Sequence, residues 1–90
     1  MDWDRVRSLQ QRSGLKTKTG KPFWISRVTE RMVFIDLPSG EQSVSRANLE
    51  RAERLVLAGR RLEGPMEYRT LIADERPAYA WAILRELGIV

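Results

Sequence analysis

Basic side chains near the N-terminus are the residues of this sequence with the most evident chemical use. Four cations and no acid lie in the segment from residue 12 to residue 21, namely Arg12, Lys16, Lys18 and Lys21. Lysine and arginine neutralise phosphates and release the counterions around a nucleic acid. The segment therefore favours a nucleic-acid backbone as partner. The alternative is a solvated loop whose lysines maintain solubility and discourage strand pairing at an edge.

The basic excess is confined to the first third of the chain. Residues 1–31 hold eight basic and three acidic side chains, whereas residues 32–90 hold eight basic and nine acidic ones, within a net charge of +4. Arg27 and Arg31 belong to the basic third and extend the predicted cationic surface along a predicted sheet. This asymmetry is the basis for expecting a nucleic-acid-binding module, because charge distribution governs association with polyanions.

Trp24 is a candidate stacking group. It alternates with Phe23 and Ile25, and strand geometry sends it to the opposite face from them. If helices cover the face of Phe23 and Ile25, Trp24 lies on the open face of the sheet, where it suits stacking on a base or contact with a partner protein. If helices cover the other face, Trp24 belongs to the core. The sequence leaves both arrangements open.

Trp81 and Arg85 suggest a different function. At 100° per residue, Trp81 projects about 140° from the centre of the apolar face that Tyr79 and Leu84 mark on the last predicted helix. An outward Trp beside an Arg one turn later has the composition of an interface anchor. The alternative hypothesis is therefore a protein-interaction or self-association module. The N-terminal helix or the terminal Ile89-Val90 could instead fold over Trp81.

Several kinds of chemistry are excluded by composition. The chain contains neither Cys nor His, which removes thiol nucleophiles, serine triads and the usual zinc ligands. Carboxylate-only chemistry remains, but 90 residues offer little material to enclose such a site. We expect no enzyme activity, no cofactor and no metal. Apolar runs are too short to span a membrane, and the start lacks the pattern of a signal peptide, so the expected location is cytoplasmic.

Three strand patterns occupy the middle of the chain. Phe23–Val28 is rich in aromatic and β-branched residues, Met32–Leu37 is almost wholly apolar except Asp36, and Gln42–Val44 is shorter. The connections Thr29–Arg31 and Pro38–Gly40 are short, which is typical of antiparallel neighbours. The sequence predicts a three-stranded meander.

Helical patterns lie before and after these strands. The expected helices run from Asp2 to Ser13, from an N-cap at Ser45 to Ala58, from Met66 to Ala73, and from Pro77 to a stop at Gly88. Asp2 and Asp74 are the expected N-caps of the first and last helices. The order α-β-β-β-α-α-α predicts an α+β fold over residues 1–90, a single small domain with helices packed on one face of the sheet.

Familiar nucleotide- and DNA-binding motifs are absent. Gly20 and Lys21 lack the rest of a phosphate-loop pattern. The last helix has no Asn, Gln, Ser or Lys between Pro77 and Gly88, which argues against a recognition helix. The stretch from Pro22 to Gly59 resembles, in architecture only, small domains that lay a sheet across a DNA groove, and no diagnostic motif accompanies that likeness.

Overall fold

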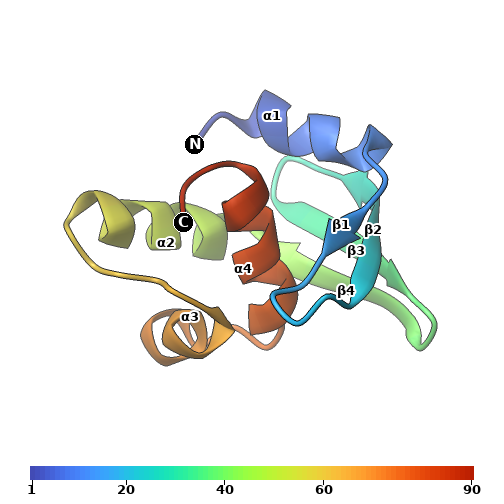
Figure 1. The fold of residues 1–90 in the computed structure, drawn as a ribbon. Coiled ribbons are helices and arrows are strands. Elements are labelled where there is room, and N and C mark those ends of the chain that lie inside the picture. Colours follow the sequence, from blue (N-terminus) through green and yellow to red (C-terminus); the bar gives the residue numbers. More distant parts are fainter.

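The chain forms an antiparallel sheet with helices before and after it. The computed structural model describes residues 1–90 (Figure 1). The elements in chain order are α1 Trp3–Ser8, the 3-10 helix η1 Leu9–Gln11, β1 Leu15–Lys16, β2 Pro22–Val28, β3 Met32–Leu37, β4 Gly40–Ser45, α2 Arg46–Leu57, α3 Pro65–Ile72 and α4 Pro77–Glu86. The strand order is β1-β2-β3-β4, and all neighbours are antiparallel. The α+β class is confirmed. The number of strands is wrong, because the sheet has four and not three.

The extra strand lies in the basic segment from residue 12 to residue 21, for which the sequence predicts no strand. Leu15 pairs with Phe23, and Lys16 pairs with Pro22. Leu15 and Thr17 are buried, while the lysines that alternate with them are exposed. This two-residue alternation is the signature of a half-buried strand. It was visible in the sequence but covered too few residues to stand out.

One face of the sheet carries the core. Alternating strand residues point toward the helices and are buried, namely Phe23, Ile25, Val33, Ile35 and Val44. The ring of Phe23 meets that of Tyr79 on α4 edge-on, with centroids 5.3 Å apart. In Figure 1, α2, α3 and α4 lie together on this side of the sheet. The opposite face is therefore uncovered, and it presents Trp24, which is 53% exposed.

The first helix is shorter than its sequence pattern. A carboxylate oxygen of Asp2 accepts a hydrogen bond from the backbone N–H of Asp4 at 3.1 Å, which confirms the N-cap. The helix ends at Ser8 and tightens into η1, after which Arg12 is already extended. The predicted end at Ser13 was wrong. Gly14, at φ +80°, then turns the chain into β1.

The predicted cap of α2 is confirmed, whereas that of α4 is wrong. The Ser45 hydroxyl accepts from the Asn48 N–H at 3.1 Å. At α4 the N-cap residue is Arg76, which makes no side-chain capping bond. Asp74 is buried, and it accepts from the Tyr68 hydroxyl at 2.8 Å and from the Asn48 side-chain amide at 3.0 Å. Its carboxylate therefore links α2 to α3.

Burial, together with the hydrogen bond to Asp74, raises the pKa of Tyr68 well above its ordinary value. The phenol therefore stays protonated and can remain a donor to Asp74.

The longest helix, α2, has 12 residues, and no helix is long and apolar enough to cross a bilayer.

Candidate nucleic-acid interface

The segment between β1 and β2 is a tight hairpin with its lysines on the outside. The Thr17 N–H donates to the Lys21 carbonyl at 2.9 Å, and the Gly20 N–H donates to the Thr17 carbonyl at 3.0 Å. The buried Thr17 hydroxyl also accepts from the Lys21 N–H at 3.0 Å. These bonds pair polar groups of the turn with one another. The side chains of Lys16 and Lys21 are exposed and make no hydrogen bond or ion pair.

Lys18 is held against the connection between α2 and α3. Its Nζ donates to the Glu63 carbonyl at 2.8 Å and lies 5.6 Å from the centre of the Trp81 ring. A Cβ on Gly64 would lie only 2.8 Å from this Nζ, so the lysine fits closely over the loop. A backbone carbonyl orients the ammonium group without cancelling its charge.

Trp81 is buried, so the predicted exposed anchor is wrong. Only 6% of Trp81 is accessible, and its indole N–H donates to the Leu62 carbonyl at 2.9 Å. The helical wheel places Trp81 away from the main core face, but its N–H is bonded to the loop containing Leu62, and Lys18 and Arg85 lie over its ring. The Arg85 guanidinium lies 5.1 Å from the Trp81 ring centre and donates to the Lys16 carbonyl.

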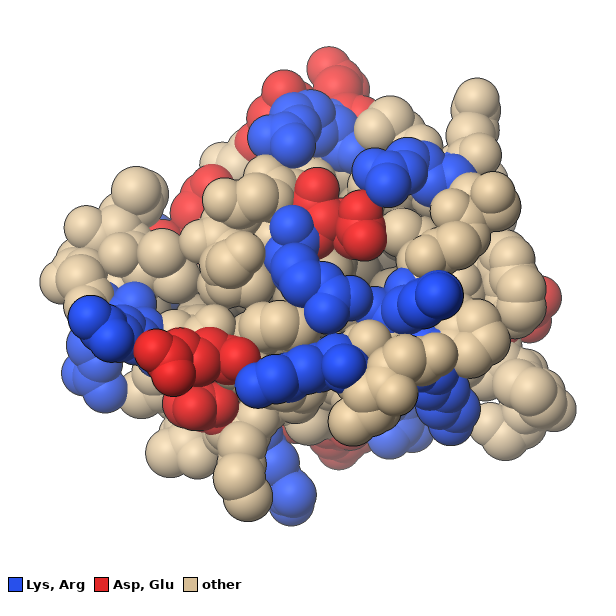
Figure 2. Space-filling view, viewed as in Figure 1, with Lys and Arg blue, Asp and Glu red and all other residues tan.

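The two predicted sites thus adjoin each other at the β1 edge of the sheet, where Arg85 contacts the Lys16 carbonyl and the Lys16 side chain lies on the sheet face opposite the helices. Arg12 pairs with Glu86 at 3.1 Å, next to Arg85 in α4. We call the resulting set of cations the hairpin–helix surface: Arg12, Lys16, Lys18, Lys21 and Arg85. The Arg12–Glu86 pair is the one ion pair with a carboxylate within it. Figure 2 shows Lys and Arg side chains gathered across the middle of this face, with acidic side chains above and to the left.

Arg27 lies on the uncovered sheet face and is already paired. Its guanidinium stacks 3.8 Å from the centre of the Phe34 ring and bonds Glu41 at 3.2 Å. The hydrogen bond from Arg27, assisted by one from Ser26, holds the pKa of Glu41 below its ordinary value. Glu41 therefore offsets the charge of Arg27.

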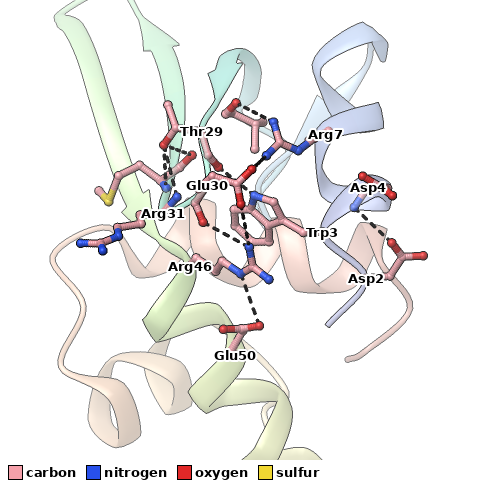
Figure 3. A network of polar contacts seen from close by, with 11 residues as sticks. Asp2, Trp3, Asp4, Arg7, Thr29, Glu30, Arg31, Arg46 and Glu50 are labelled. Carbon is pink, nitrogen blue, oxygen red and sulfur yellow. Dashed lines mark hydrogen bonds and ion pairs between the residues drawn. The ribbon is translucent and has the colours of Figure 1, made fainter.

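Arg31 lies at the far end of β2 from the hairpin. Seven residues of β2 separate the two ends, which corresponds to roughly 20 Å of extended strand. Figure 3 shows the Arg31 side chain pointing away from the network around Glu30 and Arg46. The structure therefore does not bring Arg31 together with the hairpin–helix surface, although its guanidinium is exposed.

That network pairs Arg7 of the N-terminal third and Arg46 of α2 with carboxylates. Glu30 forms ion pairs with Arg7 and with Arg46, and Arg46 also pairs with Glu50 at 3.4 Å. The Arg46 guanidinium lies 4.7 Å from the centre of the Trp3 ring, whose N–H donates to the Thr29 carbonyl at 2.8 Å (Figure 3). Arg7 and Arg46 thus have carboxylate partners, in contrast to Lys16 and Lys21.

The structure offers no cluster of three or more acidic side chains arranged to hold a metal ion. No protein-family model matches the chain, and no curated protein sequence and no solved structure is significantly similar to it.

Proposed function

We propose that this protein is a small non-enzymatic nucleic-acid-binding module whose hairpin–helix surface contacts the phosphate backbone. The observation that carries the proposal is the gathering of five cations from three segments with a single carboxylate pair among them. A surface whose cations retain their charge attracts a polyanion and gains free energy from counterion release. A cytoplasmic location remains part of this proposal.

The five cations differ in how they would act. Lys18 and Arg85 are oriented by carbonyl oxygens and by the Trp81 ring, so little side-chain entropy remains to be lost when a phosphate binds. The side chains of Lys16 and Lys21 have no partner in the fold and can adjust to the phosphates of the bound nucleic acid. If four phosphates are engaged on duplex DNA, the logarithm of affinity falls with the logarithm of salt concentration with a slope of about −3 to −4.

A protein-interaction module anchored by Trp81 is less well supported. An anchor must be accessible before the partner arrives, and Trp81 is buried with its N–H already bonded to the Leu62 carbonyl. Arg85, the other residue of that hypothesis, belongs to the hairpin–helix surface.

The decisive experiment compares two double variants by fluorescence anisotropy of labelled nucleic acids. Lys16→Ala/Lys21→Ala removes two unpaired cations from the hairpin–helix surface. Arg51→Ala/Arg54→Ala removes two exposed and equally unpaired cations from α2. Both variants lose the same charge, so a difference between their affinities shows which of the two surfaces binds the nucleic acid. Lys18 is left intact because its bond to the Glu63 carbonyl is structural.

We expect the hairpin variant to weaken binding about tenfold or more near physiological salt and to reduce the salt slope by about 2. The α2 variant should retain the parent affinity within about twofold. Equal weakening by both variants would show that net charge alone attracts the nucleic acid. No binding of duplex, single strand or hairpin RNA by the parent, even at low salt, would overturn the proposed function.

A further inference from the structure

The uncovered sheet face presents one exposed aromatic ring beside the hairpin–helix surface. Trp24 is 53% exposed, whereas Trp3 and Trp81 are buried. The other aromatic ring of this face, that of Phe34, is covered by the Arg27 guanidinium at 3.8 Å. Trp24 is therefore the single free stacking platform on this face, and the core does not require its ring.

Strand register places Lys16 next to Trp24. Lys16 lies opposite Pro22, and Trp24 is two residues further along β2 on the same face. A diagonal pair of this kind has its backbones about 7–8 Å apart, which is within reach of a Trp and a Lys side chain. Lys16 thus connects the ring to the hairpin–helix surface.

The other neighbour of Trp24 has the opposite charge. Asp36 of β3 is the direct cross-strand partner of Trp24, and its exposed carboxylate makes no hydrogen bond or ion pair. Across β2 the charge therefore changes from positive at Lys16 to negative at Asp36, with the indole between them. A phosphate backbone is attracted to the β1 side of the ring and repelled from the β3 side.

We propose that the nucleic acid bound by the hairpin–helix surface is single-stranded and that one of its bases stacks on Trp24. This inference rests on the proposed function. The backbone follows the β1 edge along Lys16 and Lys21, and the base turns inward over the sheet. A duplex cannot use the ring in this way, because its bases already stack on one another. Single-stranded DNA and RNA share the required chemistry, since every base has a π-face.

The test measures affinity for oligonucleotides of about 12 nucleotides, namely oligo-dT, oligo-U and a DNA duplex, at one salt concentration. The variants are Trp24→Ala, Trp24→Phe, which keeps a ring, and Leu57→Ala, which removes an 80% exposed apolar side chain from α2. Loss of one base–aromatic stack weakens binding about 5- to 150-fold.

We expect Trp24→Ala to lose this factor on at least one of the single strands and less than about twofold on the duplex. Trp24→Phe should retain most of the affinity, and Leu57→Ala should retain all of it. Asp36→Asn should bind single strands about two- to threefold more tightly, because it removes the repulsion next to the ring. The two single-stranded arms show whether DNA or RNA is preferred.

Tryptophan emission provides a second readout. A base stacked on Trp24 quenches its fluorescence, while Trp3 and Trp81 are shielded by burial. Quenching by oligo-dT or oligo-U in the parent should disappear in Trp24→Phe. Quenching that persists in this variant would place the base elsewhere and overturn the inference.

The failures of the two proposals can be distinguished. If Lys16→Ala/Lys21→Ala weakens binding but the duplex binds as tightly as the single strands and Trp24→Ala has no effect, the stacking inference is wrong and the proposed function stands. If no nucleic acid binds the parent at low salt, both are wrong.

Discussion

The β2–β3 turn and the hairpin–helix surface are built alike but differ in charge. In both, an indole N–H donates to a loop carbonyl, from Trp3 to Thr29 and from Trp81 to Leu62. In both, a cation packs on the ring, Arg46 on Trp3 at 4.7 Å and Arg85 on Trp81 at 5.1 Å. The two regions differ in what holds the cations.

At the turn, carboxylates hold them in addition to a backbone carbonyl. Arg46 pairs with Glu30 and Glu50, so the local charge is cancelled. At the hairpin, backbone carbonyls hold Lys18 and Arg85, which fixes the side chains but leaves their charge available. A count of basic residues treats the two regions as equal. The acceptor of each cation decides whether a carboxylate offsets its charge, and we propose that the cations without a carboxylate partner are those that bind the nucleic acid.

The largest expected effect tests what the regions share. Trp3→Ala and Trp81→Ala should each lower the free energy of unfolding by about 3–5 kcal/mol, because each removes a buried indole. Trp24→Ala should change it by less than about 0.5 kcal/mol. Urea unfolding followed by circular dichroism measures all three. A small loss for Trp81→Ala would mean that the loop does not cover it.

The next effect separates stability from binding. Arg46→Ala should lower the free energy of unfolding by about 1–2 kcal/mol, since it removes a stacked guanidinium and its bond to the Glu30 carbonyl at 3.2 Å. Its affinity for nucleic acid should stay within about twofold of the parent, because carboxylates already offset its charge. Weakened binding by Arg46→Ala without loss of stability would mean that Arg46 serves nucleic-acid binding and not the fold.

Lys18 should combine both properties. Lys18→Ala loses a charged hydrogen bond to the Glu63 carbonyl, and we expect about 1 kcal/mol less stability together with weaker nucleic-acid binding. Lys21→Ala should weaken binding with a stability change below about 0.5 kcal/mol. Thermal melts of the two variants, matched in charge, provide the comparison. Identical melts would show that the carbonyl bond contributes nothing.

The smallest effect concerns Glu41, which neutralises Arg27. Its pKa is lowered chiefly by the hydrogen bond from Arg27, so the pair stabilises the fold above the ordinary pKa of 4.5, and this contribution is lost as pH falls through the lowered pKa. The melting temperature of Glu41→Gln should therefore be slightly below that of the parent at neutral pH and equal to it in acid. A difference that persists in strong acid would mean that Glu41 acts without its charge.

Local patterns predicted most elements because their causes are local. Asp2 and Ser45 cap helices through bonds to residues two or three positions away. The predicted bounds of Met32–Leu37 are those observed. The residues that end this strand, Pro38 and Gly40, follow it directly in the sequence, so its end can be predicted locally. The strand at Leu15 was missed because its pairing partner, Phe23, lies beyond a loop with no apolar residue.

The candidate site was predicted residue by residue but not as a unit. Arg12, Lys16, Lys18 and Lys21 were identified from their spacing, and Arg85 was assigned to a separate function. These residues lie close together because α4 packs beside β1. The hydrogen bond from Arg85 to the Lys16 carbonyl joins residues 69 positions apart in the sequence. No local pattern contains that information.

The sequence by itself determined the helices, three of the four strands and the basic character of the first third, because periodicity, caps and charge act within one or two turns of chain. Only the tertiary structure decided which cations have a carboxylate partner and which tryptophan is exposed. Lys18 finds its acceptor 45 positions away at Glu63, and the Trp81 N–H finds its acceptor in the loop between α2 and α3, at the Leu62 carbonyl. Burial and charge compensation arise from segments that meet only when the chain has folded.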